Sequence, residues 1–291
     1  MITGKTRIVG IFGNPIEQTM SPSMHNAAFE ALSLPCCYLP FNINPNDLEA
    51  SVRSIIPLGI KGVNITIPFK MKVIPFLDEL DRHARLIGAV NTIEVREGRL
   101  IGHNTDGNGF IKAFNEEIDL PISGRRFLII GAGGAARAVA FALAEEGAGE
   151  IIIINRTVEK GRALAADLRK SFFSLKISVM ELNTYGMNNL ITDGDVIINT
   201  TSVGMKSSDP LIIPPDILRP SMVVCDLIYN PPETPLIRGA RKAGVRFMNG
   251  LGMLLYQGAL SFEIWTGLKA PIEVMREALI REASRTRCGT Q

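Results

Sequence analysis

The stretch that decides the fold is Phe127-Leu-Ile-Ile-Gly131-Ala-Gly133-Gly-Ala-Ala136-Arg-Ala138. Its first four residues predict a buried strand, and the alanine-rich segment after the glycines predicts a helix that continues to Glu146. The G-x-G-x-x-A pattern between them is typical of a βαβ unit that binds a dinucleotide. Gly131 permits the tight turn, Gly133 lets a pyrophosphate approach the backbone, and Ala136 allows close helix–strand packing. The alternative is a strand–helix packing turn without a ligand.

The next strand, Glu150 to Ile154, predicts which dinucleotide is bound. An NAD-binding unit carries an Asp or Glu about 20 residues after the glycines, where it holds the ribose 2′-hydroxyl. This chain has Asn155-Arg156-Thr157 at that place and no acid. An arginine can bind a 2′-phosphate through two hydrogen bonds, and Lys160 could add a second positive charge. The pattern predicts NADP(H), against the alternative of a solvated basic patch at a helix start.

Strands and helices alternate on both sides of this unit, which predicts an α/β protein with a Rossmann domain and a second α/β domain completed by C-terminal helices. Before residue 107 we expect strands at Arg7–Phe12 and Val63–Ile67, helices at Ser23–Leu32 and Asn46–Ile56, and a hairpin of Asn91–Val95 with Arg99–Gly102. Strands separated by helices suggest a largely parallel layer. After it, further strands are expected at Val196–Asn199 and Val223–Asp226, and helices at Leu254–Gly267 and from Pro271 to about Ser284. The predicted domains are 1–106 with 252–291, which would bind substrate, and 107–251, which would bind NADP.

Composition excludes several classes of protein. The 31 basic and 29 acidic residues give a formal charge of +2, which argues against a general nucleic-acid or anionic-membrane surface. The four cysteines and three histidines have no disulfide framework or zinc spacing, so no metal is expected. No signal peptide or membrane span of roughly 20 apolar residues is visible, and free thiols suit a reducing compartment. These features predict a cytoplasmic protein.

Four polar clusters lie where strands of the first domain should end, which is where an open α/β sheet binds its ligands. They are Thr19-Met-Ser21-Pro-Ser-Met-His-Asn26, Asn64-Ile-Thr66-Ile-Pro-Phe-Lys70, Gly88-Ala-Val-Asn91-Thr92 and Asn104-Thr-Asp106-Gly107. Hydroxyls, amides, one lysine and one aspartate suit a small polyhydroxylated substrate. His25 in the first cluster is expected to be a structural helix residue.

These clusters, together with G-A-G-G-A-A-R-A, N-R-T and Asn249-Gly-Leu-Gly-Met-Leu-x-x-Gln257, occur in an order that resembles the shikimate dehydrogenase family along nearly the whole chain. The resemblance implies a substrate domain joined to a Rossmann domain, with the active site in the cleft between them. It implies reversible NADPH-dependent reduction of 3-dehydroshikimate to shikimate, in aromatic amino-acid biosynthesis. The expected partner is therefore a small molecule, not nucleic acid or a membrane, and the chain could be a monomer or a homodimer.

The resemblance also assigns roles to residues. Lys70 and Asp106 match the catalytic pair of the family. Thr19, Ser21 and Tyr229 match residues that bind the substrate carboxylate. The matches to residues that hold the ring hydroxyls or line the pocket are Asn64, Thr66, Asn91 and Gln257. The expected cofactor-binding residues are Gly131, Ala132, Gly133, Gly134, Ala135, Asn155, Arg156, Thr157, Lys160 and Thr200, with Gly250 and Met253 near the nicotinamide.

Each role has a structural alternative. Lys70 could open a helix after Pro68, and Asp106 before Gly107 could be a turn or cap residue. Thr19 stands where the family commonly has Ser, and its extra methyl group crowds the carboxylate end. A quinate/shikimate dehydrogenase of broader specificity is therefore the nearest alternative enzyme. A non-catalytic NADP-binding sensor is the alternative from another class.

Overall fold

The protein was analysed as a computed structural model, which describes residues 2–182, 191, 195–206 and 208–288. The chain divides into two compact units, and each contains its own six-stranded sheet. The first unit comprises Met1–Gly109 and Leu254–Gln291, and the second comprises Phe110–Met253. The predicted α/β class is confirmed.

The sheet of the first unit is mixed, with the strand order β2-β1-β3-β5-β6-β4. Its strands are β1 (Arg7–Gly13), β2 (Cys36–Asn42), β3 (Gly62–Ile65), β4 (Glu79–Leu80), β5 (Thr92–Arg96) and β6 (Arg99–His103). β1 is parallel to both β2 and β3, whereas β5 is antiparallel to β3 and to β6. The expected largely parallel layer is confirmed, and the antiparallel strand β5 belongs to the hairpin that the sequence predicts. Glu97 and Gly98 both have positive φ, and this tight turn reverses the chain between β5 and β6.

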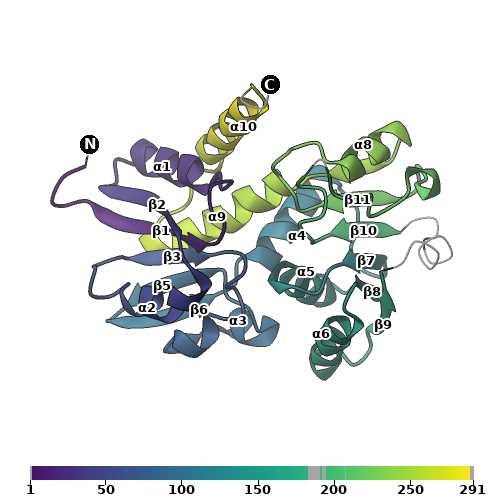
Figure 1. Cartoon of the computed structure of the whole chain (residues 1–291), viewed down its shortest axis with the longest axis horizontal. Coiled ribbons are helices and arrows are strands. Elements are labelled where there is room, and N and C mark those ends of the chain that lie inside the picture. Colours follow the sequence, from purple (N-terminus) through teal and green to yellow (C-terminus); the bar gives the residue numbers. More distant parts are fainter. Residues whose placement is uncertain (1, 183–190, 192–194, 207, 289–291) are drawn as a thin grey trace. The chain divides into compact units, whose positions relative to one another are not determined.

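Helices cover both faces of this sheet. They are α1 (Ser21–Ala31), α2 (Leu48–Arg53), α3 (Arg82–Ile87), the end of α9 (Gly250–Thr266) and α10 (Ile272–Cys288), with short 3-10 turns η1 (Pro45–Asp47) and η2 (Ile74–Phe76). Val52 of α2 and Ala84 of α3 pack with Val63 and Ile93 in one core cluster. On the other side α1 lies beside α10 (Figure 1), and Phe29 of α1 stacks on Phe262 of α9. Because side chains alternate along a strand, the residues next to Val63 and Ile93 face this second side.

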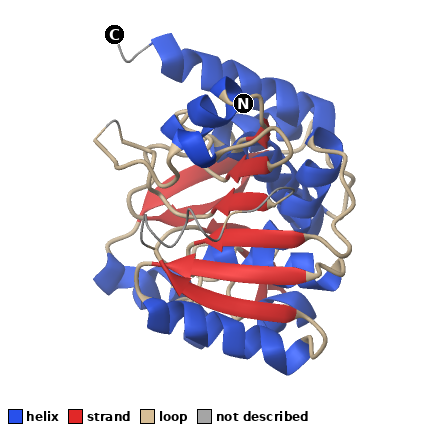
Figure 2. Cartoon of the chain, turned by 90° about the vertical axis from the view of Figure 1, so that its right-hand side faces the viewer, coloured by secondary structure: helices blue, strands red, loops and turns tan. Residues whose placement is uncertain are grey.

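The second unit contains a fully parallel sheet in the order β12-β11-β10-β7-β8-β9. Its strands are β7 (Arg126–Ile130), β8 (Glu150–Asn155), β9 (Lys176–Glu181), β10 (Val196–Asn199), β11 (Val223–Asp226) and β12 (Arg246–Met248), and Figure 2 shows strands of this unit running side by side. From β7 the chain adds strands first on one side and then on the other. This is the arrangement of a dinucleotide-binding fold, whose ligand site lies where the direction changes, between β7 and β10.

Both faces of this second sheet are buried, as its continuous apolar strands require. Leu128 and Ile130 belong to a cluster on one face, while Phe127 on the alternate side lies against Phe114. The elements around the sheet are α4 (Asp106–Glu117), α5 (Gly134–Glu145), α6 (Val158–Ser171), η3 (Pro215–Ile217), α8 (Pro235–Lys242) and the start of α9. The strand–turn–helix–strand order predicted between residues 127 and 154 is confirmed.

Candidate active site

The four polar clusters of the first unit lie at one edge of its sheet. The clusters at Thr19 and at Thr66–Lys70 follow β1 and β3, which are parallel, so their carboxyl ends share an edge. β5 is antiparallel to β3, and its first residue, Thr92, pairs with Asn64 in β3 and with His103 at the end of β6. The start of β5 and the end of β6 therefore reach the same edge. Sheet register thus brings together side chains that are far apart in sequence.

The backbone around Lys70 is held on both sides. The Phe69 N–H donates to the Thr66 carbonyl at 2.9 Å, and the Phe69 side chain is fully buried in the core. The Lys70 carbonyl accepts a hydrogen bond from the Val90 N–H at 2.7 Å. Lys70 therefore opens no helix, and its ammonium projects from a fixed turn.

Lys70 and Asp106 form an ion pair. The Lys70 Nζ lies 2.5 Å from Asp106 Oδ2, and the two side chains are 18% and 4% exposed. Asp106 is the first residue of α4, where the helix dipole favours its negative charge. Its other oxygen, Oδ1, accepts from Asn91 Nδ2 at 2.9 Å. The carboxylate is therefore aligned by an amide on one side and by the ammonium on the other.

Asn91 has a fixed orientation. The Thr105 backbone N–H donates to Asn91 Oδ1 at 2.8 Å, so the Nδ2 group must point the other way. There it lies within hydrogen-bonding distance of Thr105 Oγ1 at 2.8 Å and Gln257 Oε1 at 3.2 Å, in addition to Asp106. Gln257 in turn donates through Nε2 to the Leu254 carbonyl. Four predicted residues, Lys70, Asp106, Asn91 and Gln257, thus belong to one connected hydrogen-bonded group.

Asn64 is also buried, at 4% exposure, and its amide is oriented by Tyr38. The Tyr38 hydroxyl donates to Asn64 Oδ1 at 2.7 Å, and Asn64 Nδ2 points toward the Asn91 carbonyl and the hydroxyls of Thr92 and Ser261. The predicted Asn64 is therefore close to Asn91 in the structure.

Thr19 and Ser21 lie at the N-terminus of α1. The Thr19 hydroxyl accepts from the Ser21 N–H at 3.3 Å, and Pro22 occupies the first turn. Free N–H groups and the positive end of the helix dipole favour an anion at such a place. Thr66 follows β3 and is half-buried, and its N–H donates to the Phe12 carbonyl.

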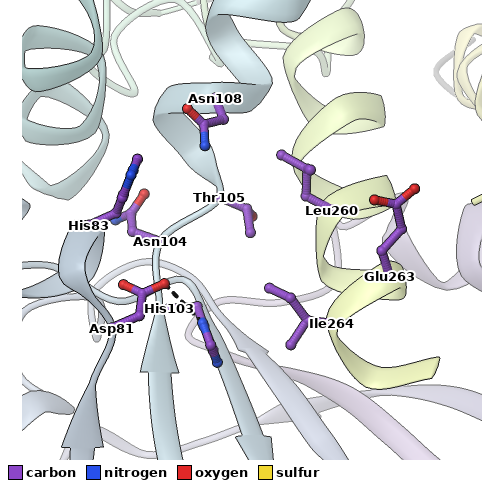
Figure 3. A pocket seen from close by; sticks show the side chains of 9 residues that line it. All are labelled: Asp81, His83, His103, Asn104, Thr105, Asn108, Leu260, Glu263 and Ile264. Atoms are coloured by element: carbon purple, nitrogen blue, oxygen red, sulfur yellow. Dashed lines mark hydrogen bonds and ion pairs between the residues drawn. The ribbon is translucent and has the colours of Figure 1, made fainter. Parts of the chain in front are cut away.

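A pocket of about 380 Å³ lies next to this group, at the ends of β6 and α9 (Figure 3). Thr105 lines it and also belongs to the network around Asn91, and the other lining residues are Asp81, His83, His103, Asn104, Asn108, Leu260, Glu263 and Ile264. His103 is held between two carboxylates, with Asp81 Oδ2 at 2.9 Å and Glu94 Oε2 at 3.0 Å. Burial lowers the pKa of His103, but the hydrogen bonds and charges of Asp81 and Glu94 outweigh it, so the pKa is raised above its ordinary value.

The glycine turn of the second unit has the geometry that its sequence predicts. Gly131 has φ +118°, and a Cβ there would lie 2.3 Å from Thr200 Oγ1. Thr200 follows β10, the neighbour of β7, and its hydroxyl donates to the Ile130 carbonyl at 2.7 Å. Gly133 precedes α5, and no atom lies within 4 Å of a Cβ built on it. The turn is therefore closed behind Gly131 and open at Gly133, where the N–H groups of Gly134 and Ala135 begin the helix.

The segment Asn155-Arg156-Thr157 joins β8 to α6. Asn155 Nδ2 donates to the Thr157 carbonyl at 2.7 Å and so fixes the turn. Arg156 and Lys160 are exposed, and among the described residues neither side chain has a hydrogen bond or ion pair. Two unpaired cations beside a helix N-terminus, with an open glycine turn on the neighbouring strand, fit a phosphorylated dinucleotide.

The remaining predicted residues lie together in the second unit. Tyr229 is half-buried after β11, and Gly250 is the first residue of α9. A Cβ on Gly250 would lie 2.1 Å from the Leu227 carbonyl oxygen, so α9 begins in close contact with the segment that carries Tyr229. Met253 is buried one turn further along. Ala132 follows Gly131 in the glycine turn and is half-buried.

Sequence reasoning assigned no role to several buried polar residues. Asp226 accepts from Asn199 Nδ2 at 2.9 Å and from the Thr234 hydroxyl at 2.6 Å, and burial raises the pKa of its carboxyl to about 6. In the first unit Ser261, Thr92 and Thr105 were given no role. Ser261 stands one turn after Gln257 on an apolar helix, so the two residues share a helix face. That spacing was the signal in the sequence that could have identified Ser261.

His25 is structural, as expected. Its ring stacks on Tyr38 with centroids 4.4 Å apart, and burial lowers the pKa of the imidazole to about 3. Neither ring nitrogen has a hydrogen-bond partner in the described part of the chain.

No helix in the described part of the chain is both long and apolar enough to cross a bilayer. No group of three or more His, Cys, Asp or Glu side chains in residues 2–182, 191, 195–206 and 208–288 is placed to hold a metal ion.

Comparison with known proteins identifies the family. Residues 11–93 match the shikimate dehydrogenase substrate binding domain, 114–212 match the shikimate/quinate 5-dehydrogenase family, and 250–280 match the shikimate 5′-dehydrogenase C-terminal domain. The shikimate dehydrogenase (NADP(+)) of Methanopyrus kandleri is 46% identical over 281 residues, which covers 96% of this chain and 97% of that protein.

Solved structures agree with this result. A shikimate dehydrogenase crystallised with NADP+ superposes with a TM-score of 0.88 at 44% identity, covering 97% of this chain and 98% of that one. The Thermus thermophilus shikimate 5-dehydrogenase, solved with NADP(H) and shikimate, has a TM-score of 0.82 at 33% identity and covers 96% and 100% of the two chains. The resemblance inferred from the ordered motifs is confirmed: this chain belongs to the shikimate dehydrogenase family.

Proposed function

We propose that this protein is an NADP-dependent shikimate dehydrogenase that reversibly reduces 3-dehydroshikimate to shikimate, with Lys70 and Asp106 as its catalytic pair. The observation that carries the catalytic assignment is the partly buried ion pair between these residues, 2.5 Å from Nζ to Oδ2. An ammonium aligned by a buried carboxylate is suited to act on an oxygen that gains negative charge during reaction. Family membership supplies the substrate class and the cofactor.

Each residue of the site has a separate role in the proposed reaction. Bound NADPH supplies the hydride. Lys70 stabilises the negative charge that develops on the carbonyl oxygen and donates a proton to it, and it accepts that proton in the reverse direction. Asp106 orients the Lys70 ammonium and accepts a hydrogen bond from a substrate hydroxyl. Asn91, held by Thr105 and Asp106, presents a fixed amide to the ring, together with Asn64, Thr66 and Gln257.

The substrate carboxylate is assigned to the α1 N-terminus, where Thr19 and Ser21 offer hydroxyls beside the helix dipole, with Tyr229 as a further hydroxyl donor. The cofactor phosphates are assigned to the turn Gly131–Ala135 and to Thr200. Arg156 and Lys160 bind the 2′-phosphate, with Asn155 and Thr157 shaping their loop, and Gly250 and Met253 line the nicotinamide end. Support for NADP over NAD comes from the two unpaired cations and from the absence of an acid at residues 155–157.

A second candidate is a quinate/shikimate dehydrogenase, and Thr19 is the residue that favours it. An assay that crosses NADP and NAD with shikimate and quinate separates the candidates by the absorbance change at the reduced nicotinamide. We expect NADP with shikimate to give the highest kcat/KM. Equal turnover of quinate would favour the broader enzyme, and no turnover of either compound would favour a binding protein.

A further inference from the structure

Ser261 lies at the centre of the buried polar group behind the proposed substrate residues. It is on α9, one turn after Gln257, and is fully buried. Its Oγ lies 3.0 Å from Asn64 Nδ2, 2.7 Å from Thr92 Oγ1 and 3.4 Å from Thr105 Oγ1. The Gln257 carbonyl oxygen lies 3.0 Å from the same Oγ. One hydroxyl therefore touches β3, β5, the turn after β6 and α9.

The sheet explains this convergence. Asn64 and Thr92 are paired in the register of β3 and β5. Asn64 stands between Val63 and Ile65, and Thr92 precedes Ile93, and these three apolar residues belong to the core cluster on the opposite face. They therefore face α9 side by side. Ser261 is the α9 residue that meets both, because it lies on the same helix face as Gln257 one turn earlier.

The hydrogen bonds continue from Ser261 to the catalytic pair. Thr92 Oγ1 donates to Asn91 Oδ1 at 3.1 Å, and Asn91 Nδ2 donates to Asp106 Oδ1 at 2.9 Å. Each hydroxyl has one hydrogen, so when Thr92 donates to Asn91, Ser261 donates to Thr92 and not to the Gln257 carbonyl. Removing the Ser261 hydroxyl would leave Thr92 without that donor and would take one of three acceptors from Asn64 Nδ2.

We propose that Ser261 is a positioning residue that sets the orientation of the Asn64 and Asn91 amides for the ring hydroxyls of the substrate. The inference rests on the proposed function, since it concerns how that substrate is held. Ser261 touches neither Lys70 nor Asp106 and acts through Thr92 and the two asparagines. Buried polar networks of this kind fix one geometry when every member is satisfied.

The main test is steady-state kinetics of Ser261→Ala with shikimate and NADP. We expect kcat/KM for shikimate to fall about 10-fold, mainly through a higher KM, because one net hydrogen bond is lost from the network. The Kd for NADP should stay within about two-fold of the wild-type value, since the glycine turn belongs to the other unit. Thr266→Ala is the matched control: it removes the same kind of bond on α9, from Thr266 Oγ1 to the Phe262 carbonyl at 2.7 Å, without reaching Asn64 or Thr92. Its KM should be unchanged.

Ser261→Cys leaves no cavity but supplies only a weak hydrogen bond, so it separates positioning from the loss of packing. We expect near wild-type thermal stability with a KM raised as in Ser261→Ala. A wild-type KM and kcat in the Cys variant, or a change in stability alone, would overturn the proposal. If the wild-type protein does not oxidise shikimate, the proposed function fails, which is a separate result from an unchanged variant of an active enzyme.

Coupling to Thr92 provides a second measurement. Thr92→Val removes the other hydroxyl with little change in shape. If the two hydroxyls act as one relay, the double variant should lose much less kcat/KM than the product of the two separate losses. A loss of kcat/KM in the double variant equal to the product of the two separate losses would contradict the relay.

Discussion

The two candidate binding regions of this chain satisfy their polar groups in opposite ways. In the first unit the amides, hydroxyls and carboxylate around Asn91 are buried and hydrogen-bonded to one another. In the second unit the turn at Gly133 is open, and Arg156 and Lys160 are exposed without a partner among the described residues. One region holds its side chains in place before any ligand arrives, whereas the other presents backbone and free cations.

The difference follows from the ligands proposed for each region. A small polyhydroxylated ring must be recognised by donors and acceptors at defined positions, and a buried network provides these at low cost in side-chain ordering. A dinucleotide carries several negative charges, which backbone N–H groups at a helix start and mobile cations can bind without such a network. Substitutions in the two regions should therefore affect different measurements.

The largest expected effect is on turnover. Lys70→Ala should lower kcat about 10²- to 10⁴-fold, the range usual for loss of a general acid–base group, while the Kd for NADP is unchanged. Stopped-flow turnover and fluorescence titration of NADP measure the two quantities. Lys72→Ala removes an exposed lysine of the same segment and should retain wild-type kcat. Near-normal turnover in Lys70→Ala would rule out the catalytic assignment.

Gly131→Ala should destabilise the second unit by about 3 kcal/mol, because a positive φ and a close contact with Thr200 both oppose a Cβ there. Chemical denaturation gives the free energy of unfolding. Gly124→Ala is the matched comparison, since Gly124 has φ +74° with nothing within 4 Å of its Cβ position. Gly124→Ala should lower the free energy of unfolding by about 1 kcal/mol, from backbone strain alone. If both variants lost the same free energy of unfolding, Thr200 would have moved away from the new Cβ at no cost in stability.

Arg156→Ala should raise the Kd for NADP about 10- to 100-fold, the usual range for one charge-assisted hydrogen bond, and leave the Kd for NAD unchanged. Arg162→Ala on α6 is the control, because Arg162 is also exposed but is paired with Glu159. Isothermal titration calorimetry with both cofactors makes the comparison. An unchanged NADP affinity in Arg156→Ala would mean that the 2′-phosphate is bound elsewhere.

The smallest effect concerns stability and pH in the first unit. His103 has a raised pKa in the folded protein, so its pairing with Asp81 and Glu94 stabilises the fold below the unfolded-state pKa, and this stabilisation is lost as the pH rises through the folded-state pKa. Near pH 6 the free energy of unfolding of the wild-type protein should exceed that of His103→Gln by about 1 kcal/mol, and this difference should shrink toward pH 9. Urea unfolding across that range measures it. Glu94→Gln should weaken the pH dependence, and a difference that is constant with pH would contradict the argument.

The glycine-turn unit of the nucleotide-binding half could be predicted from the sequence, because its signals are local. The strand, the glycines, the helix and the residues after β8 lie within about 30 residues, a typical βαβ length, and each depends on backbone conformation or on continuous apolar runs. Edge strands such as Glu79–Leu80 and Arg246–Met248 were not predicted, because two or three residues are too few to reveal a period.

Sequence alone determined the residue types of the substrate region, the family motifs and the missing acid that indicates NADP. The tertiary structure decided how those residues meet. The contacts of Ser261 with Asn64 and Thr92 span 197 and 169 positions of the chain. They exist only because strand register and the packing of α9 bring these side chains within hydrogen-bonding distance. Hydrogen bonds of that kind depend on distances of a few tenths of an ångström between distant segments, which no local pattern encodes.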